Sequence, residues 1–97
     1  SALTRVGSTL YTCGMPPIDH ETGHIVRGDI ATQTRACLRA LSFTLNHAGS
    51  SLDDVFKSLV FLTDNALATE MNVVYREFFS QCIPARSCVA AKPTASD

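Results

Sequence analysis

One arginine interrupts a sequence that otherwise predicts a buried β-strand. Residues 84–89 (PARSCV) run from a proline, which marks a strand start, into small and apolar residues. Side chains alternate between the two faces of a strand, so Arg86, Cys88 and Ala90 share one face. A guanidinium is almost never buried without a partner. Arg86 therefore either pairs with an acidic side chain of the protein or binds an anionic ligand.

The internal partner, if there is one, must be a carboxylate. The acidic residues that could supply it are Asp53, Asp54, Asp64, Glu70 and Glu77. An ion pair with one of them would make Arg86 a structural residue, whereas an anionic ligand would make it a binding residue. The residues alone leave both alternatives open.

Three further residues are candidates for a binding site. Cys13 and Gly14 end an expected early strand. A glycine there lets a ligand or another backbone approach closely, although an ordinary strand end has the same pattern. Asn72 lies on an expected helix, one residue past Met71 on an apolar stripe that consists of Met71, Val74, Tyr75 and Phe78. Exposed polar surface is the more common outcome at such a position, and ligand binding is the alternative.

Residues 20–24 (HETGH) match the H-E-x-x-H pattern of zinc hydrolases. That chemistry needs both histidines on one face of a helix and a third ligand elsewhere. Gly23 and the turn-forming residues around it break a helix here. The remaining histidine, His47, belongs to a different expected helix. An exposed hairpin loop is therefore the favoured interpretation.

The four cysteines are Cys13, Cys37, Cys82 and Cys88. They form no C-x-x-C pair, and the chain has no glycosylation sequon. We interpret them as reduced thiols of an intracellular protein, cytoplasmic or mitochondrial. Cys37 falls on an apolar helical stripe and is expected in the core. Cys82 is expected in a loop.

Length and composition indicate one globular domain over residues 1–97. The chain is 45% hydrophobic and 18% charged, as is ordinary for such a domain. Its net charge of −1 provides no electrostatic footprint for nucleic acid or an anionic membrane. No apolar run approaches the roughly 20 residues of a membrane span. Nucleic-acid and membrane partners are therefore not expected.

Hydrophobic periodicity predicts the elements that position these residues. The expected order is an extended segment over 2–12 broken at Gly7-Ser8, with a strand at 10–13, a short return strand at 25–26, a helix over 30–48, a capped turn at 51–54, a strand over 55–63, a helix over 67–79 and the Arg86 strand. The first helix is bounded by Asp29 as its N-cap and Gly49 as its stop. It is the most clearly marked element.

The order of elements predicts how the sheet is covered. Both long connections between strands contain a helix, which favours parallel strands. Residues 59–62 are apolar on both strand faces, which indicates a sheet covered on both sides. Two helices can cover one face of a four- or five-stranded sheet. The other face is left apolar, so we expect association with further copies of the chain.

The order of motifs resembles the RidA/YjgF family of reactive-intermediate deaminases. The similar segments are residues 10–14, 17–23, 28–35, 48–55, 60–64, 72–79 and 84–89. They run almost from end to end with nearly unbroken spacing, and the last of them is a specific family signature. The resemblance implies a chorismate-mutase-like α+β fold, with a mixed sheet, two helices on one face and assembly as a trimer.

The resemblance also implies an activity. Family members hydrolyse enamines and imines such as 2-aminoacrylate and 2-iminobutanoate to 2-keto acids and ammonia, in clefts between subunits. Arg86 would hold the substrate carboxylate, and backbone groups near Cys88 and Gly14 would direct the imine and water. Cys13 and Asn72 would complete substrate binding, with no metal or organic cofactor. A non-catalytic trimer that binds small carboxylates or a protein partner is one alternative, and the ribonuclease activity attributed to some members is a weaker one.

Several positions depart from the family pattern. Cys13 replaces a serine, Met15 a glutamine, and Ala68 an aromatic residue that walls the pocket. The family also places a tyrosine just before the position of Ser1 and a water-positioning glutamate on a closing strand after Asp97. We therefore expect the 97 residues to be one RidA-like domain without its N-terminal segment and closing strand.

Overall fold

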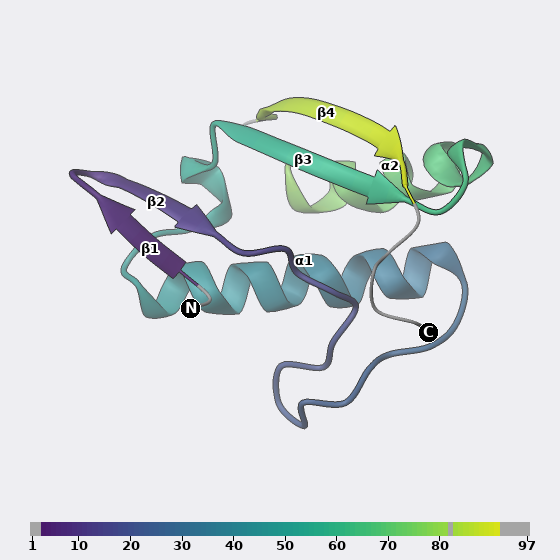
Figure 1. The fold of residues 1–97 in the computed structure, drawn as a ribbon, viewed down its shortest axis with the longest axis horizontal. Coiled ribbons are helices and arrows are strands. Elements are labelled where there is room, and N and C mark those ends of the chain that lie inside the picture. The colour runs from purple at the N-terminus through teal and green to yellow at the C-terminus, as the bar shows by residue number, and fades with distance from the viewer. Residues whose placement is uncertain (1–2, 82, 92–97) are drawn as a thin grey trace.

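The computed structural model describes residues 3–81 and 83–91, and it places two helices against one side of two short sheets (Figure 1). The elements are β1 (Leu3–Val6), β2 (Thr9–Thr12), α1 (Ile30–His47), η1 (Leu52–Asp54), β3 (Lys57–Leu62), η2 (Asn65–Leu67), α2 (Ala68–Phe78) and β4 (Ala85–Ala90). Each expected helix and strand is found with small shifts of its ends, except the return strand at 25–26. The α+β class and the placement of both helices on one face are confirmed. The loop expected around Cys82 lies outside the described residues.

The strands form two separate pairs instead of one sheet. β1 and β2 pair antiparallel as a hairpin that closes through Gly7, whose φ is +61°. β3 and β4 pair in parallel, with α2 as the crossover between them. The expected parallel pairing across α2 is confirmed. The expected four- or five-stranded sheet is wrong for the described residues, because β2 and β3 do not pair. An apolar run indicates burial, but it does not identify the neighbouring strand.

Helix α1 begins and ends where its capping residues predict. A side-chain oxygen of Asp29 accepts a hydrogen bond from the backbone N–H of Thr32 at 2.9 Å. This bond and the nearby Arg35 charge hold the pKa of Asp29 below its ordinary value. At the other end Gly49 adopts φ +82°, and its N–H donates to the carbonyl of Asn46 at 3.1 Å.

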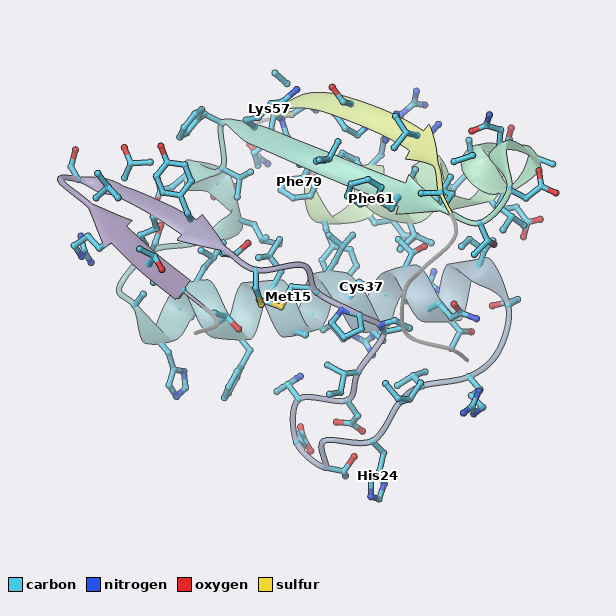
Figure 2. The ribbon with its side chains drawn as sticks, in the orientation of Figure 1. Met15, His24, Cys37, Lys57, Phe61 and Phe79 are labelled. Carbon is cyan, nitrogen blue, oxygen red and sulfur yellow. The ribbon has the colours of Figure 1, made fainter. Side chains whose placement is uncertain are left out.

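The core lies between the helices and the inner face of the β3–β4 pair. Its buried cluster consists of Leu38, Leu62, Met71, Tyr75 and Phe79. Figure 2 labels Phe79 in the space between β3 and α1. Phe79 is 1% exposed, whereas Phe78, the residue expected on the helical stripe, is only partly buried. Cys37 is half-buried on α1, and desolvation raises the pKa of its thiol to about 11.

The opposite face of the β3–β4 pair is uncovered. Leu59, Phe61 and Val89 point away from the core and are 55%, 62% and 42% exposed. Lys57 lies on the same face, where its Nζ donates to the Ser87 hydroxyl at 3.0 Å (Figure 2). The apolar second face expected from the sequence is therefore present. Among the described helices, none combines the length and the apolar character needed to cross a membrane.

The segment between β2 and α1 is a long loop over residues 13–29 that contains a tight turn. Ile18 and Ile25 form one isolated bridge, so the expected return strand at 25–26 is reduced to a single pair. The N–H of Gly23 donates to the carbonyl of Asp19 at 2.7 Å, which closes a turn. His24 extends from this loop away from the body of the molecule (Figure 2). The expected exposed hairpin loop is confirmed.

Candidate functional site

Arg86 is the second residue of β4 and lies at the end of the parallel pair where the strands begin. It is opposite Ser58 of β3 in the register. Its side chain leaves the sheet on the inner face and reaches α2, where Met71, Asn72 and Tyr75 surround it. The strand thus fixes the backbone of Arg86, and the crossover helix receives its side chain.

Every observed partner of the guanidinium is neutral. Its Nη1 donates to Oδ1 of Asn72 at 2.5 Å and lies 4.0 Å from Sδ of Met71. Its Cζ lies 4.8 Å from the centre of the Tyr75 ring. Within residues 3–81 and 83–91, none of the five candidate carboxylates forms an ion pair with Arg86. Glu77, one of the five, pairs instead with Arg35 at 3.2 Å.

The ring beneath the guanidinium is itself held in place. Tyr75 is 5% exposed, and its hydroxyl lies 2.5 Å from the hydroxyl of Ser58. Ser58 is also the residue paired with Arg86 across the strands. A short chain of contacts therefore runs from β3 through Tyr75 to the guanidinium on β4.

The remaining predicted site residues are placed differently. Cys88 is half-buried on the same strand face as Arg86, where it packs against the core opposite Val60. Cys13 and Gly14 are exposed after the end of β2, in the other sheet. Within the described part of the chain, no hydrogen bond or ring contact joins them to Arg86. One chain thus brings Arg86 and Cys88 together on β4 with Asn72 of α2 beside Arg86, whereas Cys13 and Gly14 follow β2 of the other sheet.

This arrangement suits recognition of an anion. The guanidinium has five N–H donors, and Asn72 accepts from one of them. In the part of the chain that the structure describes, the amide, the ring face and the thioether around Arg86 are all neutral, so none of them neutralises its positive charge. Arg86 is also exposed, so a small molecule can reach its free donors. A carboxylate can pair with such a fork through two parallel hydrogen bonds.

The zinc interpretation of residues 20–24 finds no support in the geometry. The histidines and the glutamate of this segment are exposed on a turn, not aligned on a helix. Across the described residues, no three His, Cys, Asp or Glu side chains form a group that could hold a metal ion. An open groove of about 440 Å³ lies between this loop and α1, away from Arg86.

Sequence reasoning overlooked the contribution of Ser58 and Tyr75. The sequence places Tyr75 on the apolar stripe of its helix and in the family motif at 72–79 but gives it no role in the site, although it follows Asn72 by three residues. Residues three apart share a helix face, so this spacing was the available signal. No signal in the sequence indicated Ser58, because its contact with Tyr75 depends on how α2 crosses β3.

Comparison with known proteins agrees with the motifs. The family model described as Endoribonuclease L-PSP matches residues 1–96. A RutC family protein of Pyrococcus abyssi is 40% identical over 97 residues, which are all of this chain and 76% of the relative. The 3-aminoacrylate deaminase RutC of Acinetobacter baylyi is 38% identical over 86 residues, 89% of this chain and 68% of the relative.

Solved structures show the same fold. RidA from an Antarctic Psychrobacter matches with a TM-score of 0.86 and 32% identity, over 97% of this chain and 77% of its own. TdcF of E. coli, solved with bound serine, also matches with a TM-score of 0.86. It is 34% identical over 96% of this chain and 76% of its own. The chain therefore belongs to the Endoribonuclease L-PSP family, the RidA/YjgF family that its motifs resemble.

Proposed function

We propose that this protein hydrolyses 2-imino acids and their enamine tautomers, such as 2-iminobutanoate and 2-aminoacrylate, to 2-keto acids and ammonia. The observation that carries the proposal is the Arg86 guanidinium, whose partners among the described residues are all neutral and which lies in the matched family signature. A deaminase among the relatives and a bound amino acid in one structural neighbour support the same substrate class.

The reaction needs a carboxylate anchor and a positioned water. An enamine first takes a proton on carbon to become the imine. The water oxygen then forms a bond to the imine carbon, and the nitrogen gains protons. The carbon–nitrogen bond breaks, ammonia leaves, and the carbon keeps a carbonyl oxygen. One water is consumed per ammonia released, and nothing is oxidised or reduced.

Each residue has a part in this proposal. Arg86 binds the substrate carboxylate, which fixes the distance of the imine carbon from β4. Asn72 accepts from Nη1 and so holds the guanidinium in one orientation. Backbone groups near Cys88 and Gly14 direct the imine and the attacking water. Cys13 contributes to substrate binding.

The proposed active unit is a homotrimer. Leu59, Phe61 and Val89 leave an apolar face exposed, and buried apolar surface favours association. Over residues 3–81 and 83–91, no hydrogen bond or ring contact joins Cys13 or Gly14 to Arg86 of the same chain. In the proposed trimer these residues reach the Arg86 of a neighbouring copy, so that the site is completed between subunits.

The first test is Arg86→Ala in a coupled assay that generates 2-iminobutanoate and follows its loss. We expect kcat/KM to fall about 30-fold or more, because truncating one partner of a charge pair has an effect of this size. Arg35→Ala is the matched control, since it removes an arginine outside the site. Sedimentation first checks that each protein has the mass of three chains.

Two results would contradict this assignment. Equal rates for wild type and Arg86→Ala would reject Arg86 as the anchor. Binding of 2-oxobutanoate by calorimetry without any turnover would indicate instead a module that binds small carboxylates.

The family description also names an endoribonuclease. A net charge of −1 gives the chain no excess of basic residues to attract a phosphate backbone. Deamination therefore fits this chain better than RNA cleavage.

A further inference from the structure

We infer that Tyr75 is a positioning residue for Arg86, and that Ser58 holds Tyr75 in place for this purpose. The inference rests on the proposed role of Arg86 as carboxylate anchor and adds a second layer to that site. It concerns two residues of β3 and α2 that do not themselves contact the substrate.

The geometry of the ring supports this assignment. The Tyr75 ring lies under the guanidinium with 4.8 Å between Cζ and the ring centre, within the range of a cation–π contact. A planar cation that rests on a ring face loses freedom to rotate out of that plane. Asn72 accepts a hydrogen bond from Nη1 at 2.5 Å, which holds the guanidinium at a second point. With these two contacts in place, the remaining N–H donors of Arg86 point in one direction, from which a ligand can approach.

The ring in turn has little freedom. Tyr75 is 5% exposed and lies 4.7 Å from the ring of Phe79, which is 1% exposed. Its hydroxyl has a polar partner, the hydroxyl of Ser58 at 2.5 Å. A phenylalanine or leucine would fill the core at this position without the hydrogen bond. The Ser58 contact thus fixes the ring at the strand position opposite Arg86.

The test separates the ring from the hydroxyl. Tyr75→Met removes the ring but keeps an unbranched apolar side chain, and Tyr75→Phe keeps the ring. We expect Tyr75→Met to raise KM roughly three- to tenfold with kcat nearly unchanged, from the usual strength of cation–π contacts. We expect Tyr75→Phe and Ser58→Ala to raise KM by about threefold or less. Their double variant should add little, because both remove the same bond.

A spectroscopic measurement tests the geometry without any assay. The Nε–H and Nη–H signals of Arg86, assigned by their loss in Arg86→Lys, should lie upfield of their positions in the urea-unfolded chain because of the ring current. The upfield shift should persist in Tyr75→Phe and disappear in Tyr75→Met. Val73→Met is the matched control, because Val73 is 61% exposed on the same helix.

Each outcome has one meaning. Signals of wild-type Arg86 without a ring-current shift overturn the inference, even if Tyr75→Met does not fold. Equal KM values for Tyr75→Met and an active wild type also overturn it. If wild type shows the shift but no deamination, the proposed function fails and the positioning of Arg86 by Tyr75 is supported.

Discussion

Two arginines contact helix α2, one from α1 and one from β4, and their surroundings differ in charge. Arg35 of α1 pairs with Glu77 at 3.2 Å, and its charge also lowers the pKa of Asp29. Arg86 of β4 meets only the amide of Asn72, the ring of Tyr75 and a thioether. One cation is thus shared between two carboxylates, while the other has none among the described residues.

This difference separates a structural arginine from a binding arginine. The Arg35–Glu77 pair is 40% and 50% exposed, so water screens it and it contributes little to stability. Arg86 gains orientation from neutral partners and keeps its charge for another molecule. An arginine that is held by neutral groups, without a carboxylate, is therefore the stronger candidate for an anion-binding site.

The largest expected effect comes from giving Arg86 a carboxylate partner, as Arg35 already has. Asn72→Asp places a carboxylate where Oδ1 of Asn72 now accepts from Arg86. The new ion pair would compete with the substrate carboxylate for the guanidinium, so we expect KM to rise about tenfold or more. The coupled deamination assay measures this change.

The folded state should tolerate Asn72→Asp, because the exchange keeps the shape of the side chain. A urea midpoint equal to or above that of wild type is expected. An unchanged KM together with that midpoint would show that the guanidinium does not bind the substrate.

A smaller effect is expected from the opposite change, in which Arg35 loses its carboxylate partner. Glu77→Gln removes the charge paired with Arg35 but keeps the shape of the side chain. We expect the free energy of unfolding to fall by about 1 kcal/mol or less, and KM to stay the same. Urea unfolding and the coupled assay give both values. A rise in KM comparable to that of Asn72→Asp would remove the distinction between the two arginines.

The smallest effect concerns pH and the second carboxylate near Arg35. The pKa of Asp29 is lowered mainly by the Thr32 N–H, with a further contribution from Arg35. A carboxyl group whose pKa is lower in the folded state than in the unfolded state stabilises the folded protein at any pH above its unfolded-state pKa. This stability is lost as the pH falls through the folded-state pKa. The urea midpoint of wild type should therefore drop toward that of Asp29→Asn between about pH 5 and pH 2.

Arg35→Gln should narrow that pH window slightly, because it removes the positive charge that adds to the effect of the Thr32 hydrogen bonds on the Asp29 pKa. Identical pH profiles for wild type and Asp29→Asn would show that the cap carries no charge-dependent stability.

Local signals predicted the elements well. Asp29 and Gly49 bound α1, and Gly7 closes the first hairpin, because caps and turns depend on residues next to one another. The pairing of β3 with β4 followed from the helix between them. The patterns of α1 and of the crossover helix α2 were therefore enough to predict that the helices cover one face of the sheet.

The sequence pattern did not predict contacts between residues that are far apart in the chain. The apolar run of β3 indicated burial but not that β2 and β3 would remain in separate sheets. The partner of Arg86 was expected among carboxylates or ligands, yet Asn72 and Tyr75 provide its contacts. Which helix face meets a strand residue depends on the crossing of α2 over the strands, and no local sequence signal encodes that angle.

The parallel crossover has a practical consequence for engineering. Ser58, Asn72, Tyr75 and Arg86 all belong to the continuous segment β3–α2–β4, residues 58–86. A single synthetic gene cassette can therefore randomise the whole cluster at once. The β1–β2 hairpin and the long helix α1 would stay constant as the scaffold, and new carboxylate preferences could be selected from one library.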